Sequence, residues 1–82
     1  MEKSQSQRIA INDINLSAFL TLKGITPDLT LTSGRVIFEF PITDELYNEV
    51  KAYNTNELVP CLDFISALRR LRGQMLSMRG QK

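Results

Sequence analysis

Residues 29–40 read Leu-Thr-Leu-Thr-Ser-Gly-Arg-Val-Ile-Phe-Glu-Phe, and this stretch decides the fold. Two runs of β-favouring residues flank Ser33 and Gly34. Glycine adopts a positive φ without a steric clash, which a two-residue hairpin loop needs. We therefore predict a β-hairpin in which Thr32 lies opposite Arg35.

This register divides the hairpin into an apolar face and a mixed face, because side chains alternate along a strand. The next expected pairs are Leu31 with Val36, Thr30 with Ile37, and Leu29 with Phe38. The apolar face then consists of Leu29, Leu31, Val36, Phe38 and Phe40, and the mixed face of Thr30, Thr32, Arg35, Ile37 and Glu39. Two strands alone are only marginally stable in water. We expect helices to cover the apolar face.

The segment before the hairpin has features of both a helix and a strand. Asn12 or Asp13 can accept hydrogen bonds from free amides at a helix start, and Gly24 after Lys23 is typical of a helix end. The apolar residues Ile14, Leu16, Ala18, Leu20 and Leu22 alternate, as they would in a strand. We favour the helix because of the segment's length and its capping residues.

Two further helices are expected after the hairpin. Thr43 can cap the first of them, with Asp44 and Glu45 in the turn where the helix dipole favours anions, and this helix should end near Asn54. The second should run from about residue 61 to residue 78. Its apolar seam consists of Cys61, Phe64, Leu68, Leu71, Met75 and Met78, spaced alternately three and four residues apart.

The seam predicts how the last helix packs. We expect its first half to cover the hairpin's apolar face, and Cys61 to be a buried thiol rather than a reactive one. Gly73 favours fraying or a break. Beyond the core, Leu71, Met75 and Met78 are candidates for self-association into a homodimer.

Together these elements predict one α+β domain over residues 11–79. One antiparallel β-hairpin is covered by three α-helices in the order α-β-β-α-α. Residues 8–11, Arg-Ile-Ala-Ile, are an open case that can add a short third edge strand. Residues 1–10 are otherwise expected to form a flexible polar segment.

Composition excludes most common enzyme classes. The 82 residues include no histidine, no tryptophan and one cysteine, which rules out Ser-His-Asp and Cys-His catalysis and an imidazole or multi-thiolate metal site within one chain. The four glycines match no nucleotide-binding motif. We expect a protein that is not an enzyme and has no cofactor. No apolar run reaches the length of a membrane span, and the amino terminus has no signal core, so we expect a cytoplasmic protein without a membrane partner.

Several features, in order, carry a resemblance. They are Asp13 near a helix start, Lys23-Gly24 at its end, the strand Gly-Arg-Val-Ile-Phe-Glu-Phe, the acidic-capped helix, and Val59-Pro60 followed by Phe64, Ala67, Leu68 and Arg69. Over residues 11–76 this order resembles a family of short uncharacterised bacterial and phage proteins, known only as a domain of unknown function. The resemblance implies a compact α+β domain among phage or mobile-element genes and brings no catalytic residues.

The last helix carries the most suggestive charge pattern. Half of the ten basic residues are Arg69, Arg70, Arg72, Arg79 and Lys82, and no acid follows Asp63. A helical wheel places Arg69, Arg72 and Arg79 on one flank of the seam, where they can contact successive phosphates. The alternative is a solvated helix end whose cations complement the dipole.

We therefore expect a small binding or accessory module of phage or mobile-element type. In this interpretation the basic helix contacts nucleic acid nonspecifically or a larger nucleoprotein partner. The alternative function is a structural or regulatory homo-oligomer that binds protein alone, without nucleic acid.

Other candidate sites have simpler structural explanations. Phe38 and Phe40 can stack on bases, but the register assigns both to the core. Tyr47 and Tyr53 suit the edge of a core. The acids Glu39, Asp44, Glu45 and Glu49 can be read as a metal or acid/base cluster. Helix capping and solubility explain them better.

Overall fold

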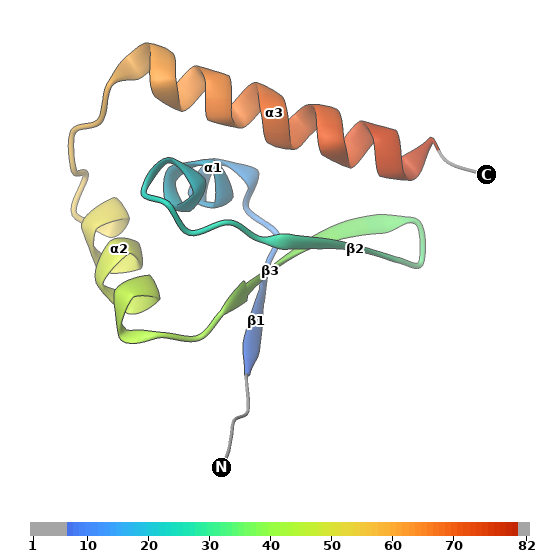
Figure 1. Ribbon diagram of the computed structural model, residues 1–82, viewed down its shortest axis with the longest axis horizontal. Helices are drawn as coiled ribbons and strands as arrows, with labels where there is room; N and C mark the ends of the chain where they lie inside the picture. Colours follow the sequence, from blue (N-terminus) through green and yellow to red (C-terminus); the bar gives the residue numbers. More distant parts are fainter. Residues whose placement is uncertain (1–6, 81–82) are drawn as a thin grey trace.

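The computed structural model describes residues 7–80 as a three-stranded antiparallel sheet with three helices (Figure 1). Along the chain the elements are β1 (Arg8–Ile11), α1 (Ile14–Leu22), β2 (Asp28–Thr32), β3 (Arg35–Pro41), α2 (Asp44–Asn54) and α3 (Cys61–Arg79). The predicted α+β class is confirmed. The predicted element order is wrong at its start, because the chain begins with a strand and reads β-α-β-β-α-α.

The hairpin has the predicted register. Thr32 pairs with Arg35, Leu31 with Val36, Thr30 with Ile37 and Leu29 with Phe38. Ser33 has φ 53° and Gly34 has φ 78°, so both loop residues are left-handed, as in a hairpin turn that matches the twist of its strands.

Strand β1 answers the open question about residues 8–11. It pairs antiparallel with β3, so the strand order is β1-β3-β2. The Ile42 N–H also donates to the Gln7 carbonyl across 3.0 Å, which continues this ladder by one pair. Paired structure therefore begins inside the segment expected to be flexible, since residues 8–10 are part of the sheet. Residues 1–6 lie outside the described residues.

The three helices start at capping side chains or at proline. Asp13 Oδ1 accepts hydrogen bonds from the backbone N–H groups of Asn15 and Leu16 at 2.9 and 3.2 Å, which confirms α1 as a helix. Thr43 Oγ1 accepts from the Leu46 N–H at 3.0 Å and caps α2. Helix α3 follows Pro60 and runs without a break through Gly73, contrary to the expected break. Relative to alanine, Gly73 lowers the stability of the helix by about 1 kcal/mol. The packing of α3 against the rest of the chain outweighs this cost.

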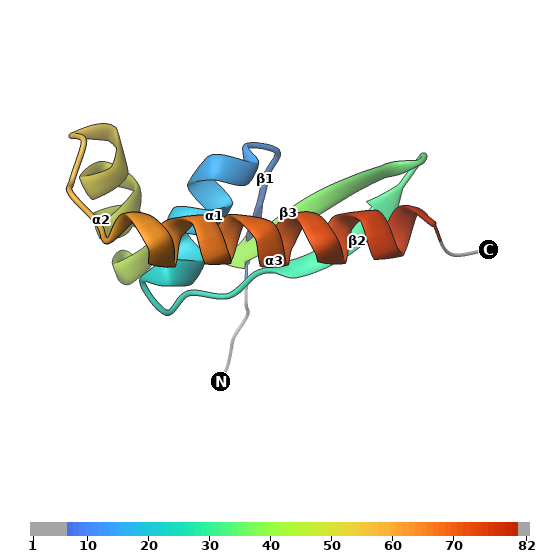
Figure 2. The same ribbon diagram turned by 90° about the horizontal axis from the view of Figure 1, so that it is seen from above.

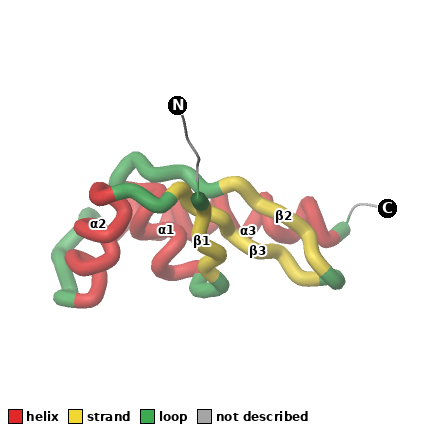
Figure 3. The backbone as a smooth tube through the Cα atoms, turned by 90° about the horizontal axis from the view of Figure 1, so that it is seen from below, coloured by secondary structure: helices red, strands yellow, loops and turns green. Residues whose placement is uncertain are grey.

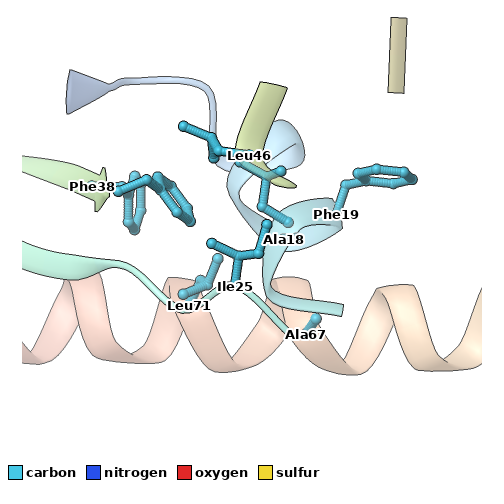
Figure 4. Packing of buried hydrophobic residues seen from close by; sticks show 9 residues of the cluster. Ala18, Phe19, Ile25, Phe38, Leu46, Ala67 and Leu71 are labelled. Atoms are coloured by element: carbon cyan, nitrogen blue, oxygen red, sulfur yellow. The ribbon is translucent and has the colours of Figure 1, made fainter. Parts of the chain in front are cut away.

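The core lies between the apolar face of the sheet and helices α1 and α3 (Figure 4). Its buried apolar residues are Ala18, Phe19, Leu20, Ile25, Val36, Phe38, Phe40, Leu46, Ala67 and Leu71. The tip of the hairpin leaves this core, since Leu31 is 46% exposed. In Figure 4, Leu71 of α3 lies beside Ile25 from the connection between α1 and β2.

Helix α3 packs mainly on α1, and less on β2 and β3. Figures 1 and 2 show its first half passing over α1 and its second half running along the hairpin. The expectation that its first half covers the hairpin is therefore wrong. Helix α1 occupies that place because the short connection from β1 returns the chain directly over the sheet.

The molecule is thin, with principal extents of 41 × 38 × 16 Å. Figure 3 views it from the side of the sheet that faces away from α3. None of the described residues on the mixed sheet face is buried. The sheet is thus packed on one face only.

Candidate nucleic-acid interface

Helix α3 presents its arginines to solvent. Arg69, Arg70, Arg72 and Arg79 are all exposed. At 100° per residue, Arg69, Arg72 and Arg79 share one flank of the helix, whereas Arg70 lies on the other. Lys82, the fifth basic residue of the predicted cluster, lies outside the described residues. The structure thus brings three of the four arginines of α3 onto one surface.

A pattern missed by the sequence analysis runs along the same flank. The residues of this outer stripe are Leu62, Ile65, Arg69, Arg72, Leu76 and Arg79, again spaced alternately three and four residues apart. Leu62 is 77% exposed and Leu76 is 57% exposed, so the apolar members of this stripe lie at the surface like the arginines. The signal was available in the sequence, but arginines interrupt the apolar residues, so the stripe did not read as a seam.

The arginines of the outer stripe have no carboxylate partner among residues 7–80. The ion pairs within that range join Arg8 to Asp28, and Lys23 to Glu49 and Glu57. Asp63 is the one acid on α3 and lies on the flank of Arg70. The positive charge of this flank is therefore available to an anionic ligand.

The distances along α3 suit a repeating anion. Arg72 and Arg79 are separated by about 10.5 Å along the helix axis, and Arg69 and Arg79 by about 15 Å, at 1.5 Å per residue. Each guanidinium can donate two parallel hydrogen bonds to one phosphate. Phosphates of one B-DNA strand follow at about 3.4 Å along the axis, so this span covers about four of them.

Arg70 belongs to a different feature. With Thr21, Leu22, Asp63, Ser66 and Ala67 it lines a depression of about 230 Å³ between α1 and α3. The Asp63 carboxylate in the wall disfavours an anion there, so this depression does not extend the arginine surface.

Most of the residues predicted for self-association pack in or against the core instead. Leu71 is 2% exposed, Met75 packs against the core cluster, and Met78 is half-buried. The middle of the seam is thus covered by the chain itself, and self-association through Leu71 would require the core to open.

Cys61 is exposed, contrary to the expected buried thiol. A strict three-four spacing drifts by about 20° per heptad around a straight helix. Cys61 therefore does not lie on the side of the helix that carries the buried Ala67 and Leu71. It also lies at the end of α3 that precedes the contact with α1. Exposure alone does not make it a site.

The burial of the aromatic side chains shows which of them a base could reach. Phe38 is 1% exposed and Phe40 is fully buried, so neither can stack on a base. Tyr53 packs edge-on against Phe19, with ring centroids 5.3 Å apart. Burial, and to a lesser degree the charge of Asp13, raises the pKa of Tyr53. Tyr47 is 55% exposed on α2.

The acidic candidates do not form a cluster. Asp44 and Glu45 lie in the first turn of α2, Glu49 lies 4.0 Å from Lys23, and Glu39 belongs to the mixed face of β3. No group of three potential metal ligands forms among the described residues.

Lys23 fastens the end of α1 to the connection between α2 and α3. Its ammonium group donates a hydrogen bond to Glu57 and lies 5.4 Å from the centre of the Phe19 ring. The bond to Glu57 raises the pKa of Lys23 against a smaller opposing effect of desolvation. Beside this contact lies a depression of about 460 Å³, lined by Phe19, Tyr53, Asn54, Asn56, Glu57, Val59 and Phe64. The Lys23 contact is structural, since it closes the connection onto α1.

The fold and this surface define an α+β protein with a cationic helix on its outside. Within residues 7–80, none of the helices combines the length and the apolar character needed to cross a bilayer. Residues 6–77 match the family model described as Domain of unknown function (DUF5659), and the chain belongs to this family. The match includes β1, which the resemblance drawn from residues 11–76 omitted. No curated protein and no solved structure matches the chain.

Proposed function

We propose that the chain is a small non-enzymatic accessory module, of the phage or mobile-element type, that contacts nucleic acid nonspecifically through α3. The observation that carries this proposal is the placement of Arg69, Arg72 and Arg79. All three are exposed on one flank and lack a carboxylate partner among residues 7–80. Such a flank favours phosphate over any neutral ligand.

Contact with the phosphate backbone explains the arrangement better than base recognition does. Arginine forks bind phosphate oxygens without regard to sequence. The side chains best suited to stack on bases, Phe38 and Phe40, are buried. The proposed module therefore binds many nucleic acids with similar affinity and strong dependence on salt.

The test is fluorescence anisotropy of labelled single- and double-stranded DNA and RNA. We expect a micromolar Kd, weakened about 40-fold between about 50 and 200 mM salt if three phosphates are contacted. The double variant Arg72→Gln/Arg79→Gln should bind more weakly, with a salt slope lower by about two.

A matched control removes the same charge elsewhere. Arg35→Gln/Lys51→Gln changes two exposed cations that belong to β3 and α2 rather than to α3. This control should retain most of the affinity. Absence of binding at the lower salt, or equal losses in both double variants, would refute the phosphate-contact model.

A further inference from the structure

We propose that the outer edge of β1 is a homodimer interface, through which two copies pair antiparallel and join their sheets into one. β1 is an edge strand, and Arg8, Ile9 and Ala10 are exposed. The other edge strand, β2, is contacted by β3 and α3, and β1 is contacted by β3 and α1. An open strand edge is a template for pairing with another strand.

The hydrogen-bond pattern shows which groups of β1 are available. The Ile42 N–H bonds to the Gln7 carbonyl, and successive residues of a strand point their backbone groups to alternate sides. Gln7, Ile9 and Ile11 therefore bond to β3, while the backbone groups of Arg8 and Ala10 point to the outside. Among residues 7–80 no strand lies there.

These outward groups fit a second copy of the same strand. In an antiparallel pair with its twofold axis at Ala10, the N–H and carbonyl groups of Ala10 bond to the partner's Ala10, and Arg8 lies opposite the partner's Asn12. Directly opposed residues share a face, so Ile9 meets the partner's Ile11 on the apolar face. One register thus satisfies both the backbone and the apolar pattern.

Two side chains favour this occupant over an unrelated peptide. Ile9 belongs to the apolar face but is 37% exposed, and the partner strand would cover it. At the axis, Ala10 faces its own copy with Cα atoms about 5.5 Å apart, where a methyl group fits and a large side chain would crowd. With a net charge of +1 per chain, repulsion between copies is small.

Four strand residues form few hydrogen bonds, so we expect a weak dimer that depends on concentration. The measurement is sedimentation velocity without nucleic acid, from about 10 to about 500 µM, a range suited to a small interface. The mass should rise from monomer to dimer over this range. A wild-type chain that stays monomeric at the highest concentration would overturn the proposal.

Ala10→Pro is the sharpest variant. It removes an N–H that points outward and leaves the ladder between β1 and β3 intact. Two hydrogen bonds are lost per dimer, so association should weaken at least about tenfold. Ala10→Ser keeps the N–H and a small side chain and should dimerise like the wild type. A dimer that Ala10→Pro leaves unchanged would place the interface elsewhere.

Two further changes keep the test decisive if proline harms folding. Ala10→Glu places like charges close to the axis and should give a folded monomer. In a Cys61→Ser background, Ala10→Cys should form an intermolecular disulfide, because the expected Cα separation lies within disulfide range. Arg8→Cys in the same background should not form this disulfide, because in the proposed register residue 8 of one copy lies far along the strand from residue 8 of the other copy. Equal cross-linking of both variants would contradict the register.

Discussion

Leu71 and Leu76 are five residues apart on the same helix, yet they have opposite environments. Leu71 is 2% exposed within the core, and Leu76 is 57% exposed on the outer stripe. Truncating a buried leucine removes transfer energy and leaves a cavity. We expect Leu71→Ala to lower the free energy of unfolding by about 2–5 kcal/mol. Leu76→Ala should change it by less than about 0.5 kcal/mol.

Urea denaturation followed by circular dichroism measures both values. The pair forms its own control, because the same side chain is truncated in the same helix. If Leu76→Ala cost as much as Leu71→Ala, the outer stripe would be covered by protein in solution rather than open to a ligand.

Single residues also show what the sequence could predict. The caps at Asp13 and Thr43 and the loop at Ser33 and Gly34 act over one turn, so their chemistry is local and readable. The exposure of Cys61 was not readable, because it depends on where α3 first meets α1. Local hydrogen bonding can be inferred from neighbours in sequence, whereas burial requires the partner element.

The same distinction holds for elements. The alternation around Ser33-Gly34 was sufficient for the register of the hairpin, since a one-residue slip would turn its apolar face outward. β1 was left open because four residues carry too little pattern without their partner β3. The seam of α3 predicted an apolar side correctly. It could not show that α1, rather than the hairpin, covers the first half of that side.

The contact between the end of α1 and the connection to α3 depends on pH. Lys23 has a raised pKa because it donates to Glu57, and its usual value is 10.5. A group whose pKa is higher in the folded than in the unfolded protein stabilises the folded state fully at pH values below its unfolded pKa. This stabilisation is lost as the pH rises through the folded pKa. We expect the stability difference between wild type and Lys23→Met to be full at about pH 8 and smaller at about pH 11.5.

Urea unfolding at both pH values measures this difference. Tyr53 also has a raised pKa, with the same sign of pH dependence, so both chains should carry Tyr53→Phe to remove its contribution. Lys51→Met, on the exposed side of α2, serves as the control. A Lys23 difference that stays constant with pH would mean that the Glu57 contact contributes no linked stability.

At the scale of the whole molecule, the candidate site could be predicted in part. The arginines of α3 and their common flank follow from helical periodicity. That the part of the seam around Leu71 is buried inside the chain, and that β1 forms an edge of the sheet, follow only from the packing of the described elements. Surfaces that remain after folding are set by every element together, so they are the hardest feature to infer from sequence.

A thin molecule with one covered sheet face should have modest stability, which makes binding visible as thermal stabilisation. A ligand present at ten times its Kd adds about 1.4 kcal/mol, or about 6–10 °C in Tm for a domain of this size. We expect the Tm to rise with protein concentration because of pairing at β1. Separately, it should rise with added duplex DNA at low salt because of the arginines on α3.

Two variants separate these effects by scanning calorimetry. Ala10→Pro should lose the dependence on protein concentration and keep the response to DNA, whereas Arg72→Gln/Arg79→Gln should show the reverse. If either variant abolished both responses, one surface would serve both purposes, and edge pairing and phosphate contact would not be independent. If each variant removes its own response, two copies joined at their sheet edges carry two separate cationic helices.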